Sequence, residues 1–301
     1  MTEFKIKTGE RTNRIGRHLP TSGGLKKTLQ LARDQALEAI QIFVSNPQGW
    51  AVPATLRPDA RAFVEGAREI GLDPVVVHAK YLINLASPDP DHRERSARAL
   101  AAELVAAASV GAHFVVVHSG SHGGDGEERG MERLVEGISR ARELAAEEAG
   151  ADGQRPAEPL VENSVGAGTQ LCSAFGSLAW VAESAEVRVC LDTAHAYVAG
   201  YDLSTPEGAR NVAAGIRDAL GDRVGILHLN DPRNTLGSHR DGHERIGEGH
   251  VATEAWVELF GGLPGVPAVM ETPYATPEVN AEQVRIAKEL AGGLPISRKG
   301  V

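Results

Sequence analysis

Short apolar runs rich in β-branched residues recur along the chain, separated by segments whose apolar residues have helical spacing. The runs are continuous rather than alternately apolar and polar, which is typical of strands covered on both faces. We predict eight strands, at residues 14–19, 39–44, 73–79, 112–118, 158–163, 187–193, 224–230 and 267–272. Helical spacing is clearest for Leu25, Leu29, Ala32 and Ala36, and for Leu100, Leu104 and Ala108.

This alternation predicts a parallel sheet with helices packed outside it. Eight strand–helix units within about 260 residues match the α/β class of (β/α)8 or TIM barrels, whose functional residues lie at the carboxyl ends of the strands. A doubly wound open sheet is the alternative, but no GxGxxG follows the first strand and GxxxxGK[ST] is absent from the sequence. We therefore expect one barrel domain over residues 1–301, with its core at about 14–292.

Composition restricts the class of protein further. The chain has 42% hydrophobic residues and no apolar run near the ~20 residues that cross a bilayer, so we expect no membrane association. Its first residues are polar, and its two cysteines, Cys172 and Cys190, cannot make a disulfide framework. We expect a cytoplasmic protein, and the sequence shows no sign of an obligate protein partner.

Each of the last six predicted strands ends in a side chain that can bind a metal ion. These residues are His78, His118, Glu162, Asp192, His228 and Glu271. Because the carboxyl ends of barrel strands surround one opening, we expect the six side chains to lie close together. The loops that follow add three more candidates, which are His195, Asp241 and His243.

Taken singly, a histidine or carboxylate at a strand end is more often a cap or a core residue than a ligand. Five imidazoles and four carboxylates at one opening are different, since their buried charge needs neutralising cations. Mixed ligation by histidine and carboxylate suits Zn²⁺ first, with Mn²⁺ or Fe²⁺ as alternatives. One zinc ion takes three or four protein ligands, so the set predicts two or three ions.

The net charge of the chain argues, at first, against a phosphate-containing substrate. With 31 Lys and Arg against 40 Asp and Glu, it is −9, which argues against binding phosphates through a basic surface. Three divalent ions would bring six positive charges to four ligand carboxylates, leaving the opening at about +2. A phosphate diester therefore remains an acceptable substrate, and closely spaced metal ions suit its displacement chemistry.

The sequence resembles the endonuclease IV (deoxyribonuclease IV) family of apurinic/apyrimidinic endonucleases. The resemblance runs from about Gly16 to Thr272, through GRHLPTSGGL (16–25), HAKYLINL (78–85), VVHSGSH (116–122), VENSVGAG (161–168), CLDTAHAYVAGYDL (190–203), HLNDPRNTLGSHRDGHERIGEG (228–249) and MET (270–272). It implies a xylose-isomerase-like TIM barrel that depends on zinc and acts on DNA at the nucleoid. Its expected reaction in base excision repair is cleavage of double-stranded DNA 5′ to an abasic site, giving a 3′-hydroxyl and a 5′-deoxyribose phosphate. Removal of 3′-blocking groups is a further expected activity.

The resemblance also assigns roles to residues. It implies three zinc ions, with Mn²⁺ or Fe²⁺ possible at one position: one on His78, His118 and Glu162, one on Glu162, Asp192, His228 and Glu271, and one on His195, Asp241 and His243. Glu162 is the expected catalytic residue, because it bridges two ions and orients the nucleophile. His18 matches a histidine beneath the metal cluster, which we expect to support the ligands.

DNA contacts are implied at three positions. Tyr81 and Asn230 match segments that line the abasic pocket in the family; without the resemblance, core packing and turn formation are equally good interpretations. Gln48 stands in the NPQGW loop, where the family commonly has an arginine that inserts near the lesion. Trp50 in the same loop is expected to pack beneath it rather than stack on DNA.

Two other functions compete with DNA cleavage. Sugar isomerases and epimerases use the same barrel and similar ligands, but they need only one or two ions with a catalytic lysine or a glutamate pair. The pairs Asp192 with His195 and Asp241 with His243 exceed that need. A scaffold that keeps its metals for structure is the non-enzymatic alternative. A nucleophilic hydrolase is disfavoured, since the chain has no GxSxG motif.

Overall fold

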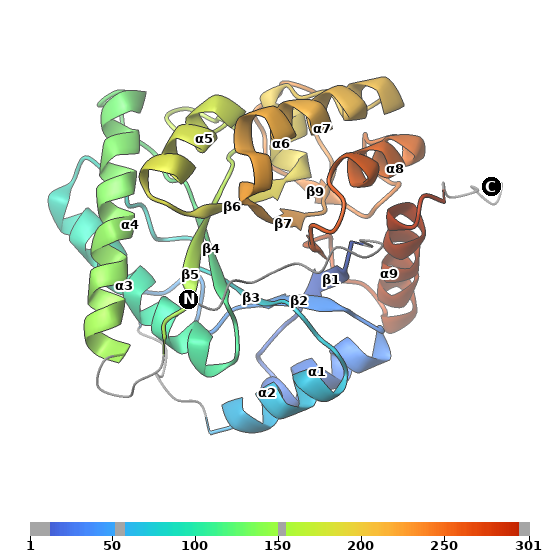
Figure 1. Cartoon of the computed structure of the whole chain (residues 1–301), viewed down its shortest axis with the longest axis horizontal. Coiled ribbons are helices and arrows are strands. Elements are labelled where there is room, and N and C mark those ends of the chain that lie inside the picture. The colour runs from blue at the N-terminus through green and yellow to red at the C-terminus, as the bar shows by residue number, and fades with distance from the viewer. Residues whose placement is uncertain (1–12, 52–57, 150–154, 295–301) are drawn as a thin grey trace.

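Eight parallel strands close into a barrel in the computed structural model, which describes residues 13–51, 58–149 and 155–294 (Figure 1). Around the barrel the order is β1-β10-β7-β6-β5-β4-β3-β2. The strands are β1 Ile15–His18, β2 Ala39–Ile42, β3 Val75–His78, β4 Phe114–His118, β5 Glu158–Glu162, β6 Arg188–Asp192, β7 Val224–His228 and β10 Ala268–Met270. Each lies within one predicted run. The TIM-barrel prediction is confirmed, and the open sheet is rejected.

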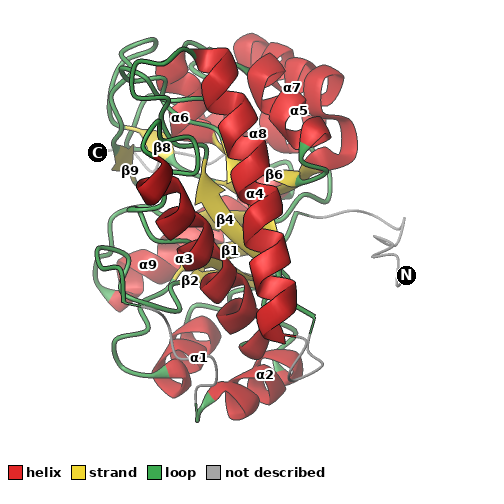
Figure 2. Cartoon of the chain, turned by 90° about the vertical axis from the view of Figure 1, so that its left-hand side faces the viewer, coloured by secondary structure: helices red, strands yellow, loops and turns green. Residues whose placement is uncertain are grey.

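Helices enclose the strands on the outside, as Figure 2 shows. They are α1 Leu25–Asp34, α2 Ala60–Glu69, α3 Pro90–Ser109, α4 Glu127–Ala149, α5 Phe175–Ser184, α6 Thr193–Ala199, α7 Pro206–Leu220, α8 Thr253–Gly262 and α9 Pro277–Ala291. A short 3-10 helix, Gly221–Arg223, precedes β7, and the strands β8 Asp231–Pro232 and β9 His243–Glu244 form a small antiparallel ribbon. None of the helices in the described segments is long and apolar enough to cross a membrane.

The prediction for the first helix is wrong at its C-terminal end, because α1 stops at Asp34. Leu25 and Ala32 are buried on α1, but Ala36 lies beyond the helix, is exposed and has a φ of 50°. The N–H of Leu37 donates to the carbonyl oxygen of Ala32, so Ala36 occupies the left-handed position that ends many helices. Of the predicted single domain over residues 1–301, positions 1–12, 52–57, 150–154 and 295–301 lie outside the described residues.

The barrel interior is built in layers. One apolar layer contains Ala39, Val76, Val116, Leu160, Cys190, Ile226 and Val269. On β1 the equivalent position is Gly16, where a Cβ atom would come within 2.1 Å of the carbonyl oxygen of Ala39. Side chains two residues apart on a strand point the same way. The next layer toward the carboxyl ends therefore consists of His18, Gln41, His78, His118, Glu162, Asp192, His228 and Glu271.

Candidate metal centre

The polar layer forms the floor of a cavity of about 750 Å³ at the carboxyl end of the barrel. Three aromatic side chains, Phe43, Tyr81 and Tyr274, form part of its wall. The cavity brings together side chains from separate strands and loops, including His18, His78, His118, Glu162, His195, Asp241, His243 and Glu271. The candidate ligands that were predicted to converge at one opening thus meet at one cavity.

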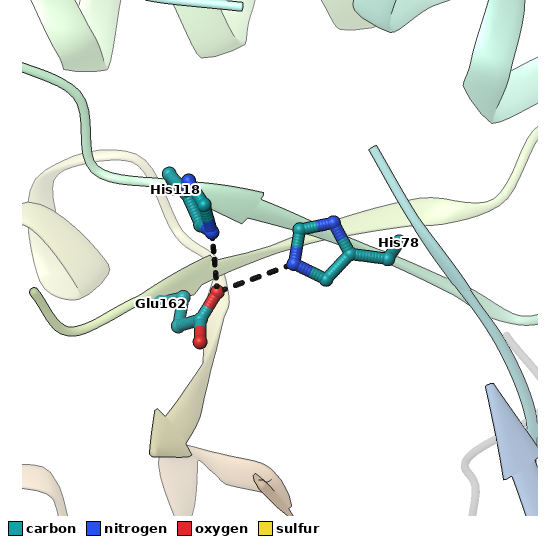
Figure 3. Close-up of side chains that lie close together, drawn as sticks. All are labelled: His78, His118 and Glu162. Carbon is teal, nitrogen blue, oxygen red and sulfur yellow. Dashed lines mark ion pairs between the residues drawn. The ribbon is translucent and has the colours of Figure 1, made fainter. Parts of the chain in front are cut away.

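Glu162 lies at the centre of a first group with His78 and His118, which Figure 3 shows converging from three neighbouring strands. Its Oε2 atom is 3.5 Å from His78 Nε2 and 3.3 Å from His118 Nε2. This oxygen is buried and has no hydrogen-bond partner among the residues that the structure describes. The Nδ1–H of His78 donates to the carbonyl oxygen of Ala79 at 2.7 Å, so Nε2 is the ring nitrogen that faces the carboxylate. Once Nε2 has lost its proton, it and Glu162 Oε2 are two acceptors that face each other in a buried site, which fits a shared metal ion.

A second group consists of Glu162, Asp192, His228 and Glu271, whose ligand atoms lie within 4.8 Å of one another. His228 Nδ1 is 3.0 Å from Glu162 Oε1 and 3.2 Å from Glu271 Oε2. The other ring nitrogen, Nε2, donates to Gln41 Oε1 at 2.8 Å. That hydrogen bond leaves Nδ1, once it has lost its proton, as the nitrogen that can bind a metal ion among the three carboxylates.

The third group forms where β6 runs into α6. Asp192 caps this helix by accepting the N–H of His195 at 2.9 Å, which brings His195 back over the strand end. Asp241 Oδ1 lies 3.4 Å from His195 Nε2 and 3.3 Å from His243 Nε2. His195 Nδ1–H donates to the carbonyl oxygen of Asn163 at 2.9 Å, and His243 Nε2 is buried without a hydrogen-bond partner. Asp192 also faces both imidazoles, so it adjoins the second and third groups.

The charges of these groups depend on one another. Burial alone would raise the pKa of Glu162, but His228 and His118 hold it well below its usual value. Burial would also raise the pKa of Glu271, but His228 and His78 lower it to about 2. Both carboxylates are therefore ionised across the physiological range, as metal ligands must be.

The pKa values of the two histidines in the third group are raised rather than lowered. Burial opposes their protonation, yet Asp192 and Asp241 raise the pKa of His195 to about 10 and that of His243 to about 9. Protons and metal ions accordingly compete for the same nitrogen atoms.

Two amides and a histidine support the ligands. Gln41 Nε2 donates to Glu271 Oε1 at 2.6 Å and approaches His18 Nδ1 at 3.1 Å. Sequence reasoning missed Gln41, although a polar residue inside the apolar run 39–44 was a usable signal. Asn163 was also missed; its Oδ1 accepts the N–H of Asp192 at 2.6 Å. His18 lies beside Glu271, with Nδ1 3.9 Å from the carboxylate.

Asn230 differs from the expectation. It is fully buried, its Nδ2 donates to Asp192 Oδ2 at 2.6 Å, and its Oδ1 accepts the N–H of Glu271 at 2.8 Å. A direct DNA contact needs an accessible side chain, so this burial corrects the expectation for Asn230. The amide is fully occupied in holding two carboxylates in place.

The side chains of the other two predicted DNA contacts are exposed. Tyr81 is 52% exposed and lines the cavity, with its ring 5.6 Å from that of His78. Gln48 is exposed in the loop after β2. Trp50 packs against the hydrophobic core, as expected, and its ring lies 4.2 Å from the guanidinium of Arg95.

The fold and this ring of ligands define a xylose isomerase-like TIM barrel, and the family model of that description matches residues 29–291. Probable endonuclease 4 from Carboxydothermus hydrogenoformans is 33% identical to the chain over 280 residues, covering 91% of this chain and 95% of that protein. The same protein from Chloroflexus aurantiacus is 36% identical over 267 residues, covering 86% and 91%. The crystal structure of endonuclease IV from Thermus thermophilus superposes with a TM-score of 0.78 at 34% identity, covering 93% of this chain and 99% of the other.

The chain belongs to the endonuclease IV family, which confirms the resemblance seen in the sequence. It is a DNA-cleaving hydrolase, and its family acts in DNA repair and depends on metal ions. A D-tagatose 3-epimerase-like protein also superposes, with a TM-score of 0.65 but only 18% identity. That likeness shows a shared fold alone.

Proposed function

We propose that this protein is a zinc-dependent apurinic/apyrimidinic endonuclease of base excision repair. It hydrolyses the phosphodiester 5′ to an abasic site in double-stranded DNA, leaving a 3′-hydroxyl and a 5′-deoxyribose phosphate, and it removes 3′-blocking groups. It acts at the nucleoid in the cytoplasm without an obligate protein partner. The observation that carries the proposal is the buried, unpartnered Oε2 of Glu162, which two imidazole nitrogens approach within 3.5 Å.

The proposed ligands are the nine residues predicted from the sequence. His78, His118 and Glu162 hold one ion, Glu162, Asp192, His228 and Glu271 a second, and His195, Asp241 and His243 a third. Zinc held there supplies Lewis acidity, which activates water near neutral pH and stabilises charge on the leaving 3′ oxygen.

The chain's own residues orient this chemistry. Glu162 is the proposed catalytic residue, since both of its oxygens face ligand nitrogens and each belongs to a different group. Gln41 and Asn230 hold Glu271 through its carboxylate and its backbone N–H. Tyr81 and Gln48 are the proposed DNA contacts, because Tyr81 lines the cavity and Gln48 is exposed next to Pro47, whose carbonyl oxygen accepts the N–H of Tyr81.

The test combines metal content with cleavage. Elemental analysis of the purified protein should find about three metal ions per chain, mostly zinc. The protein should nick a duplex with one synthetic abasic site on its 5′ side, lose this activity on complete chelation and regain it with zinc. A parallel panel of ketoses covers the epimerase alternative. Sugar epimerisation without nicking, or nicking that survives complete metal removal, would contradict the proposal.

A further inference from the structure

Lys80 is a buried lysine directly after β3, and it does not line the cavity. Its Nζ atom is 3.2 Å from Glu103 Oε1 on α3, and the two side chains are 0% and 1% exposed. Burying an ion pair costs free energy of desolvation that its mutual attraction often does not return. The buried Lys80–Glu103 pair lies close to the candidate site in the chain, so we looked for a function of this pair other than stabilising the fold.

The ammonium of Lys80 binds both ends of one loop. This Gln48 loop, residues 45–51, follows β2 and carries the proposed DNA contact at its exposed tip. Lys80 Nζ donates to the hydroxyl of Ser45 at the start of the loop and to the carbonyl oxygen of Ala51 at its end, the latter at 2.9 Å. One buried charge thus fixes the span of the loop.

The carboxylate of Glu103 completes the connection. Its Oε1 accepts the hydroxyl of Ser45, and its Oε2 accepts the backbone N–H of Lys80 at 3.1 Å. The next N–H along the chain, that of Tyr81, donates to the carbonyl oxygen of Pro47 at 3.1 Å. The ion pair consequently ties the Gln48 loop to the backbone that presents Tyr81.

Trp50 holds the same loop against α3. Its ring packs against the guanidinium of Arg95 at 4.2 Å and against the ring of His92 at 5.6 Å, both on α3. The loop is thus held on α3 by a buried ion pair and by an aromatic contact, while Gln48 itself stays exposed.

We propose that Lys80 and Glu103 are positioning residues for DNA binding, which hold the Gln48 loop and Tyr81 in one fixed arrangement before DNA arrives. This inference rests on the proposed function. A loop ordered in advance loses less conformational entropy on binding. Gln48 lacks a positive charge to attract the phosphate backbone, so ordering of its loop matters more for affinity.

The test uses the double variant Lys80→Met/Glu103→Gln. A single substitution would leave an unpaired buried charge and risk unfolding. The double variant removes both charges, keeps similar volumes, and leaves an amide oxygen to accept the N–H of residue 80. The matched control is Arg142→Met/Glu158→Gln, which removes an ion pair of 2.9 Å at the first residue of β5, at the opposite end of the barrel.

Two readouts separate this inference from the function on which it rests. Hydrogen exchange of peptides spanning residues 45–51 should accelerate about tenfold or more in the double variant and stay unchanged in the control. The KM for an abasic duplex should rise about tenfold while kcat stays within about twofold, again only in the double variant. Unchanged exchange in residues 45–51 overturns the inference whether or not the enzyme cleaves DNA. Unchanged KM in a variant whose parent cleaves abasic DNA overturns it and leaves the proposed function standing.

Discussion

His228 Nε2 donates a hydrogen bond to Gln41 Oε1 at 2.8 Å, and this contact decides which nitrogen of the imidazole is free to bind a metal ion. Nδ1 then faces Glu162 and Glu271. The amide nitrogen of Gln41 donates to Glu271 at 2.6 Å, so one uncharged side chain orients two ligands of the same group.

Gln41→Leu should weaken zinc binding at the second group by about 10- to 100-fold, because the variant loses both the tautomer of His228 and the orientation of Glu271. The check is a competition titration against a chromophoric chelator, with circular dichroism to confirm the fold. Gln41→Glu is the comparison variant, since it keeps an acceptor for His228 but cannot donate to Glu271 when ionised. Native affinity in Gln41→Leu would show that Gln41 does not support the ligands.

Glu162→Gln should retain the barrel and lower kcat for abasic-site cleavage by at least about 10³-fold. The substitution keeps the side-chain volume but removes the charge that two metal groups share. Single-turnover nicking at saturating enzyme, with zinc content measured on the same preparation, checks this expectation. Turnover like that of the native enzyme would remove Glu162 from the mechanism.

The sequence predicted all eight barrel strands and the position of six candidate ligands at the carboxyl ends of six of them. It succeeded because side chains two residues apart on a strand point to the same face. A polar side chain two positions after a side chain of the apolar layer therefore also points into the barrel, in the next layer. Asp192 follows Cys190 in this way, and Glu271 follows Val269.

Uncharged amides were harder to interpret. Gln41 is marked only as a polar residue inside an apolar run, and Asn230 belongs to no pattern that separates a ligand support from a loop residue. Both side chains act across distant parts of the chain. Gln41 meets His228 only because the barrel closes, which leaves just β1 and β10 between β2 and β7. Lys80 and Glu103 were missed for the same reason, since their pairing depends on how α3 packs against the segment that follows β3.

Zinc binding should release protons near neutral pH. The pKa of His195 is raised to about 10 and that of His243 to about 9, against 6.5 for a free imidazole, so both rings are protonated at pH 7 in metal-free protein. Their contribution to the stability of metal-free protein is complete below about pH 6.5 and is lost as pH rises through 9 to 10. At pH 7, zinc binding to the third group must therefore displace about two protons, and its affinity must increase with pH.

Isothermal titration calorimetry of metal-free protein at pH 7, repeated in buffers of different ionisation enthalpy, measures this proton release. His195→Asn/His243→Asn serves as the control, and it should lose about two released protons per chain. A binding enthalpy that does not depend on the buffer would contradict the assignment of both rings as ligands.

Gln48→Arg should tighten binding to an abasic duplex. Gln48 is exposed in its loop, so a longer cationic side chain meets no packed neighbour and gains an attraction to phosphate. At fixed salt the Kd should fall several-fold, and the slope of log K against log salt should steepen by about 1. Gln48→Met, similar in length but uncharged, separates the effect of charge from that of size. Equal affinity of the Arg and Gln proteins across the salt series would show that position 48 does not approach the DNA backbone.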